Sequence, residues 1–229
     1  MQSSSTSARR VSPPQPHELP PLHGFTVTDF SQRIAGPLAS RFLTDLGCSC
    51  THVDPPTGPT WQSPANSVLH RGKEMIQIDL ASVAGQAAAR ELVRRSDVVV
   101  EPPFATAEVR SLNPRAICLT LPAFCPDDEH FADVEAAAGD FEACLLASMG
   151  VFQDMGLNRT LMGQRVSYSP LPLASAYSSV LAAYSVVMAL LSLTNYSGSL
   201  SLNGGGAEKR PTQLTVILLN YSYCTVSNH

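Results

Sequence analysis

Along the first half of the chain, the apolar and polar positions alternate between a pattern typical of strands and a pattern typical of helices. Short runs that are apolar or alternate with polar residues, as is typical of strands, occupy residues 25–30, 48–53, 75–80, 97–101 and 116–121. Segments with helical spacing or helix-favouring composition lie between them, at residues 37–46, 82–95 and 107–112. Strands that alternate with helices in this way predict an α/β fold with an open, mostly parallel sheet.

The first helix of this series carries the clearest signals. Leu38, Phe42 and Leu46 recur at i, i+4 and i+8 and give the helix one apolar face. Ala35-Gly36-Pro37 fits the helix start, because proline presets φ and lacks an N–H that would be unpaired there. Gly47 is a candidate for the helix C-cap. A helix N-terminus beside a glycine turn suits a phosphate-bearing ligand, although most such turns only connect elements.

Two further helices are expected in the second half, at residues 133–150 and 173–193. The second is uncharged and about as long as a membrane span, but its serines and the lack of a flanking positive cluster favour a long buried helix over a transmembrane one. The main domain is therefore expected over residues 25–193. Residues 1–24, rich in serine and proline, predict a disordered arm, and residues 194–229 predict an irregular tail with one isolated strand.

Composition argues against several classes of function. Charged residues make up 15% of the chain and the net charge is -4, so no basic surface for nucleic acid is expected. The six cysteines form no CxxC pair, which favours reduced, buried thiols over a zinc site, and no metal is expected. We expect a cytoplasmic protein. Arg9-Arg10 after a serine-rich start faintly resembles a transit peptide and leaves a mitochondrial location open.

Seven short motifs follow one another between residues 33 and 115. They read RIAGPLA (33–39), DLG (45–47), VDPP (53–56), HRGK (70–73), IDL (78–80), SDVVVE (96–101) and LNPR (112–115). Each motif is weak alone. In this order they resemble the family III CoA-transferases, the group that includes formyl-CoA transferase, the carnitine CoA-transferase and α-methylacyl-CoA racemase.

The resemblance implies a Rossmann-like sheet, here an incomplete large domain of that family, and a defined chemistry. In the family an aspartate attacks the acyl thioester, and the resulting anhydride becomes an enzyme–CoA thioester from which a second acid collects the CoA. By position, Ala35, Gly36 and Pro37 would line the CoA pocket with their backbone, and Arg71 and Lys73 would contact the phosphates. The alternative for these two cations is a solvated loop. Coenzyme A and acyl-CoA are implied as substrates, with no covalently bound cofactor.

The sequence departs from the family where the chemistry should occur. Ser175 falls on the position of the family's aspartate, and a serine cannot form the anhydride, so the catalytic residue stays unassigned. Asp140 or Glu142 could replace that carboxylate, although the polar face of a helix explains both. The family's glycine-rich turn is replaced by Leu121-Pro122-Ala123-Phe124, and its small domain is not recognisable.

These features leave three hypotheses. The first is an enzyme that transfers CoA between an acyl-CoA and a carboxylic acid. The second is a catalytically inactive, truncated homologue that binds CoA, or that forms a homodimer or pairs with a full-length homologue. The third is an unrelated nucleotide-binding α/β domain, which lacks support because no GxGxxG fingerprint follows the first strand. None of the three requires a membrane or a nucleic acid.

Overall fold

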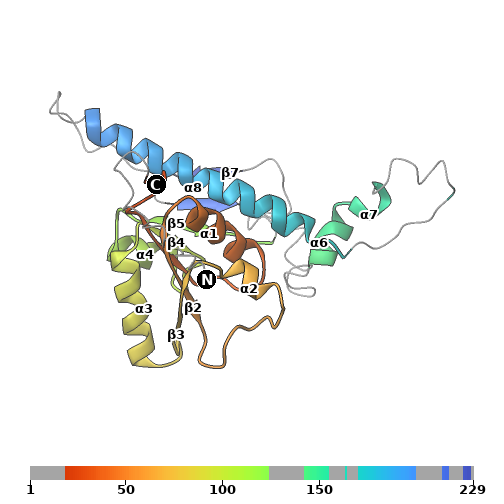
Figure 1. The fold of residues 1–229 in the computed structure, drawn as a ribbon, viewed down its shortest axis with the longest axis horizontal. Helices are drawn as coiled ribbons and strands as arrows, with labels where there is room; N and C mark the ends of the chain where they lie inside the picture. The colour runs from red at the N-terminus through yellow and green to blue at the C-terminus, as the bar shows by residue number, and fades with distance from the viewer. Residues whose placement is uncertain are drawn as a thin grey trace, which may run out of the picture.

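The fold is built on one seven-stranded sheet. A computed structural model describes residues 19–123, 142–154, 163, 170–199, 213–216 and 224–227 (Figure 1). The strands are β1 (Thr26–Asp29), β2 (Ser49–Asp54), β3 (Glu74–Gln77), β4 (Val98–Val100), β5 (Ile117–Thr120), β6 (Gln213–Val216) and β7 (Cys224–Ser227). Their order is β3-β2-β1-β4-β5-β6-β7, and all neighbours are parallel except β6 and β7. The prediction of an open, mostly parallel α/β sheet is confirmed.

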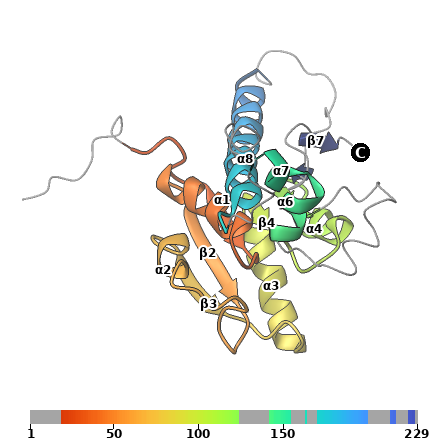
Figure 2. The same cartoon turned by 90° about the vertical axis from the view of Figure 1, so that its right-hand side faces the viewer.

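Helices cover both faces of this sheet. They are α1 (Ala35–Asp45), α2 (Asn66–Leu69), α3 (Val83–Arg95), α4 (Thr106–Leu112), α6 (Glu142–Ser148), α7 (Val151–Asp154) and α8 (Leu173–Ser199). Helices α1 and α8 lie side by side on one face in both views, and α3 lies on the other (Figures 1 and 2). In β4, Val98 and Val100 enter the core under α1 and α8, whereas Val99 enters the core under α3 and α4. Burial on both faces explains why this strand is a continuous apolar run.

The local signals at the helix ends act as predicted. Ser82 is the N-cap of α3, and its hydroxyl oxygen accepts a hydrogen bond from the Gly85 N–H at 2.9 Å. Gly47 follows α1 with a φ of 106°. A Cβ on Gly47 would lie 2.3 Å from a side-chain carbon of Pro20, so glycine is required both for the backbone conformation and for the close approach.

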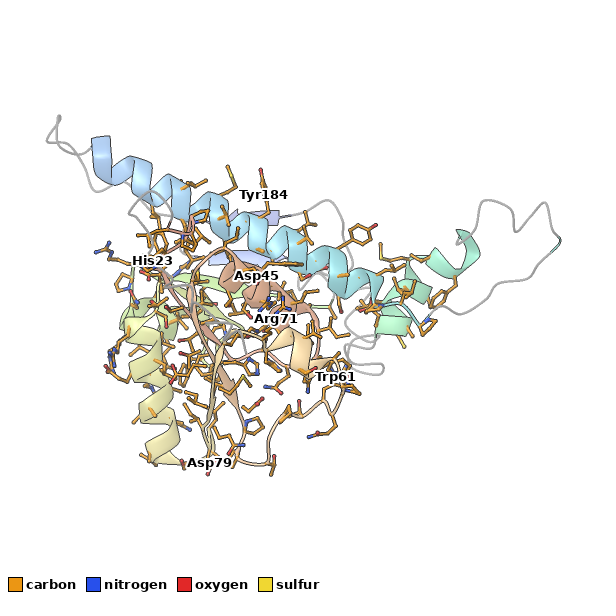
Figure 3. The ribbon with its side chains drawn as sticks, viewed as in Figure 1. His23, Asp45, Trp61, Arg71, Asp79 and Tyr184 are labelled. Carbon is orange, nitrogen blue, oxygen red and sulfur yellow. The ribbon has the colours of Figure 1, made fainter. Side chains whose placement is uncertain are left out.

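Helix α8 is buried along one face only. Ala182, Val186 and Leu190 are buried against the α1 side of the core. The opposite face carries the exposed side chains Tyr177, Val180, Leu181, Tyr184, Met188 and Leu191. Figure 3 shows Tyr184 directed away from the sheet. The segment Leu173–Leu193 is long and apolar enough to cross a membrane, a test that a core helix also passes. The face of α8 that packs on α1 is buried, as expected for a core helix, whereas the opposite face is exposed.

The two ends of the chain differ in part from expectation. Residues 1–18 lie outside the described part, but Leu22 is buried and its N–H donates to the Leu46 carbonyl at 2.9 Å, so packing begins before residue 25. The strand expected to be isolated at residues 215–219 is instead β6, which pairs with β5. The prediction of isolation was wrong, because the edge of β5 offers unpaired backbone groups to a further strand. The expected helix from 133 is described only from residue 142.

Candidate functional site

A pocket of about 840 Å³ opens where the strand order reverses. Strands β2 and β3 extend from one side of β1, and the chain then returns to place β4 on the other side. Residues 30–36, which follow β1, and Glu101, which follows β4, line the pocket. Ligands of open α/β sheets bind in this crevice, outside the carboxyl ends of the strands at the switch point. The remaining lining residues are Thr60, Trp61, Leu121, Glu142 and Ser175.

The turn between β1 and α1 forms one wall of the pocket. A Cβ on Gly36 would lie 2.2 Å from the Ser31 hydroxyl oxygen, so the close approach of these two residues within the turn requires glycine. The Ser31 backbone N–H and hydroxyl both donate to one carboxylate oxygen of Asp29, which holds the turn. Ala35 and Gly36 lie in the first turn of α1 and line the pocket. The wall is therefore a fixed backbone surface at a helix N-terminus, where anions are favoured.

Two residues with strained backbone conformations line this pocket. Among the described residues, Arg33 and Glu101 are the non-glycine positions with positive φ, at 70° and 48°, and both line the pocket. Such conformations persist where surrounding structure holds them, and they cluster at functional sites. The Glu101 carboxylate accepts a hydrogen bond from the Leu121 N–H. Burial disfavours its charged form and raises the pKa of Glu101 above its usual value, although the Leu121 N–H opposes this shift.

A carboxylate that lines the pocket caps the start of α8. One oxygen of Glu142 accepts from the Ala174 N–H at 2.6 Å, and the other accepts from the Ser175 hydroxyl at 2.5 Å. The Ser175 N–H lies 3.3 and 3.2 Å from these two oxygens. Glu142 thus satisfies N–H groups that the first turn of α8 leaves unpaired, and its charge suits the positive end of that helix. Figure 2 shows α6, which carries Glu142, beside the beginning of α8.

A buried polar network lies behind the α1 wall. One oxygen of Asp29 accepts from the Ser40 hydroxyl at 2.5 Å and lies 3.0 Å from both Lys73 Nζ and His52 Nδ1. Burial alone would raise the pKa of Asp29, but the Lys73 ammonium and His52 outweigh it and hold this pKa well below its usual range. The other ring nitrogen of His52 lies 3.3 Å from Asp54. The network joins β1, β2, α1 and the residue before β3.

The structure separates the five residues that the sequence proposed for the CoA pocket. Ala35 and Gly36 line it, whereas Pro37 is not among the residues that line it. Arg71, labelled in Figure 3, is exposed. Its backbone carbonyl accepts a hydrogen bond from the Arg41 guanidinium. The side chain of Lys73 is fully buried and donates to Asp29, Ser40 and the Pro37 carbonyl, the last at 2.8 Å. The structure thus places the Lys73 ammonium in an internal ion pair in which all three of its N–H groups have acceptors, and the phosphate contact of Lys73 stays a prediction.

Several pocket residues carried no signal strong enough to single them out in the sequence. Trp61 stands in a polar loop, and Figure 3 places it near the α6–α8 end of the molecule. In the sequence, Glu101 is only the last residue of the SDVVVE motif, although its position after a parallel strand is where ligand-binding residues of such sheets lie. The sequence offers Glu142 as a candidate carboxylate, but its proximity to Ser175 depends on the packing of α6 against α8. Asp140 lies outside the described residues, as do nearly all residues of the glycine-containing connection after α7.

Metal ligands do not gather in the described ranges. No group of three or more His, Cys, Asp or Glu side chains there has the arrangement of a metal site. Cys48, Cys50 and Cys118 are buried free thiols. Burial raises the pKa of Cys50 to about 12 and that of the other two to about 11, so these thiols are poor nucleophiles at neutral pH.

Comparison with known proteins adds a family to this geometry. Residues 22–199 match the family model CoA-transferase family III. The CoA-transferase/lyase DddD of Marinomonas sp. (strain MWYL1) is 42% identical over 179 residues, which are 74% of this chain and 21% of that protein. Human alpha-methylacyl-CoA racemase is 30% identical over 185 residues, which are 76% of this chain and 44% of that protein. The chain thus spans less than half of either relative.

A solved structure supports the fold. The crystal structure of the hypothetical protein Rv3272 from Mycobacterium tuberculosis superposes with a TM-score of 0.67 at 24% sequence identity. The match covers 89% of this chain and 56% of that one. At this level of identity the likeness concerns the sheet and its helices, not the chemistry.

Proposed function

The chain belongs to CoA-transferase family III, and on that basis we propose that it binds an acyl-CoA and takes part in transferring CoA to a carboxylic acid. The observation that carries the proposal is the pocket at the switch point of the sheet, which joins a helix N-terminus to two carboxylates. Acyl-CoA and a free carboxylic acid are the substrates, and CoA itself is the group transferred. No covalently bound cofactor is needed for this chemistry.

The pocket offers suitable contacts for such a substrate. The backbone of Ala35 and Gly36 at the start of α1 suits a negatively charged or strongly polar group. Arg33 lines the pocket. Of the two cations that the sequence proposed for the CoA phosphates, Arg71 is exposed outside the pocket lining and could reach phosphates at the surface, whereas the side chain of Lys73 is buried. Phe30 and Trp61 add apolar surface for an acyl or pantetheine chain.

The alternative is a catalytically inactive homologue that binds CoA or acts as a partner. Ser175 at the position of the family's aspartate favours this alternative. So does the exposed apolar face of α8, because an exposed patch of this kind commonly marks a protein interface. A second copy of the chain in a homodimer, or a full-length homologue, would bury that face.

Calorimetric titration with acetyl-CoA tests the proposal. We expect saturable binding by the wild type, and weaker binding by Arg71→Ala because a phosphate loses its cation. Arg94→Ala is the matched control, since Arg94 is also exposed but lies on α3, which covers the other face of the sheet, where it pairs with Glu91 at 3.3 Å. Folded wild-type protein that binds neither acetyl-CoA nor CoA would overturn the proposed function.

A further inference from the structure

The chemistry of CoA transfer restricts which pocket side chain can act as the nucleophile. The group must accept an acyl unit from the thioester and then carry CoA itself. A carboxylate can do both, because its carbon receives the thiolate once the carboxylate has been acylated. A serine ester cannot carry CoA, since the hydroxyl oxygen has no carbonyl carbon of its own. Ser175 therefore cannot be the nucleophile for this reaction.

Two carboxylates line the pocket, and their environments differ. Glu101 is buried at a strained backbone position, and its carboxylate is tied to the Leu121 N–H. Glu142 is held at the positive end of the 27-residue helix α8 by the Ala174 and Ser175 N–H groups and the Ser175 hydroxyl. These donors fix its orientation, and they can also hydrogen-bond oxygens on which negative charge develops during attack. Of the two, Glu142 has the setting that acyl transfer requires.

We propose that Glu142 is the catalytic carboxylate of this site, supplied from α6 to the point where Ser175 stands on α8. The inference rests on the proposed function and assigns its reacting atom. Ser175 becomes a positioning residue: its hydroxyl, 2.5 Å from one Glu142 oxygen, holds the carboxylate that an aspartate at position 175 would otherwise provide. Serine is short enough to leave room for the incoming glutamate.

The reaction balances without a further reagent. A Glu142 oxygen attacks the thioester carbonyl carbon, the C–S bond breaks, and CoA leaves as a thiolate from a glutamyl–acyl anhydride. The thiolate attacks Cδ of Glu142, the anhydride C–O bond breaks, and the first acid leaves as a carboxylate. The acceptor carboxylate then attacks the glutamyl–CoA thioester at Cδ and again releases the thiolate. Attack of that thiolate on the acceptor's carbonyl carbon gives the new acyl-CoA and regenerates the Glu142 carboxylate.

Exchange of isotopically labelled acetate into acetyl-CoA measures this cycle without knowledge of the natural acid. We expect exchange by the wild-type chain, and hydroxylamine added during turnover should leave a hydroxamate on the peptide that carries Glu142. Glu142→Gln should lose exchange by at least about a hundredfold while its calorimetric affinity for acetyl-CoA stays within about twofold. The amide oxygen still accepts from the α8 N–H groups. Glu91→Gln, which alters an exposed carboxylate on α3, should exchange at the wild-type rate.

Ser175→Ala separates positioning from catalysis. Loss of one hydrogen bond to a charged group should lower kcat by about tenfold, leave KM for acetyl-CoA nearly unchanged, and keep the hydroxamate on Glu142.

The outcomes separate this inference from the function on which it rests. Wild-type protein that binds acetyl-CoA but shows no exchange, or that is trapped at another residue, overturns the assignment of Glu142 and leaves CoA binding intact. So does a Glu142→Gln variant that retains exchange. Protein that is folded but binds no acetyl-CoA overturns the proposed function itself.

Discussion

Replacement of Lys73 by methionine should destabilise the fold, because this lysine balances a buried charge. Its side chain and that of Asp29 are both 0% exposed, and the ammonium lies 3.0 Å from the carboxylate. Methionine keeps most of the volume but leaves Asp29 charged and without its cation. Breaking a buried pair in this way costs about 3–5 kcal/mol, a large share of the roughly 5–15 kcal/mol that a domain has available.

Urea unfolding followed by far-ultraviolet circular dichroism measures this loss. Asp29→Asn combined with Lys73→Met should recover part of the free energy of unfolding. The asparagine oxygen can still accept from Ser31, and its amide NH2, in place of the second oxygen, can donate to the Ser40 hydroxyl, so neither group requires a cation. Lys73→Met should leave acetyl-CoA affinity unchanged in the folded protein, because the ammonium is not in the pocket. A loss of unfolding free energy below about 1 kcal/mol, or a large loss of affinity without loss of stability, would refute the reasoning and restore Lys73 as a phosphate ligand.

Three further predictions concern local features. Ser82→Ala should lower the free energy of unfolding by about 1 kcal/mol in the same urea assay, since the Gly85 N–H loses its acceptor; Ser82→Asp should retain most of it. Gly36→Ala should lower the melting temperature and acetyl-CoA affinity together, because its Cβ would overlap Ser31; an unchanged protein would show that the turn can shift. The pKa of Asp29 lies below its ordinary 3.8, so its stabilisation is present above that value and is lost as pH falls through the folded-state pKa. Unfolding free energy measured from pH 6 downwards should fall less in Asp29→Asn, and equal slopes would contradict the low pKa.

The sequence predicts the strands and helices of the first half of the sheet, but not the strand pairing at the β5 edge. Runs such as residues 97–101 predict strands because their apolar pattern is local and independent of partners. The helix cap at Ser82 is local in the same way. The order of strands is not, since it depends on which edges remain open after the first βαβ unit has formed. The pairing of β6 with β5 is a feature of this non-local kind, because the four residues 213–216 are too few to show which strand they will pair with.

The features of the site also fall into those that depend on local sequence and those that depend on tertiary packing. Ala35 and Gly36 could be predicted because the turn motif itself forms the wall of the pocket. The burial of Lys73 could not, since it requires Asp29 from β1 and Ser40 from α1 to converge on one ammonium. The pairing of Glu142 with Ser175 joins residues 33 positions apart. Only the packing of α6 on α8 brings these two residues together. The helical pattern of each segment accounts for its own residues and gives no sign that the two segments are in contact.

The measurement that tests the central claim most directly uses the chain's single tryptophan. Trp61 lines the pocket together with the α1 turn and Glu142, so its fluorescence reports on that site alone. The account predicts that acetyl-CoA changes this fluorescence saturably, with one molecule bound per chain and with CoA competing. Folded protein whose Trp61 fluorescence does not respond, while calorimetry shows binding, would contradict the claim by placing the CoA ester elsewhere on the molecule.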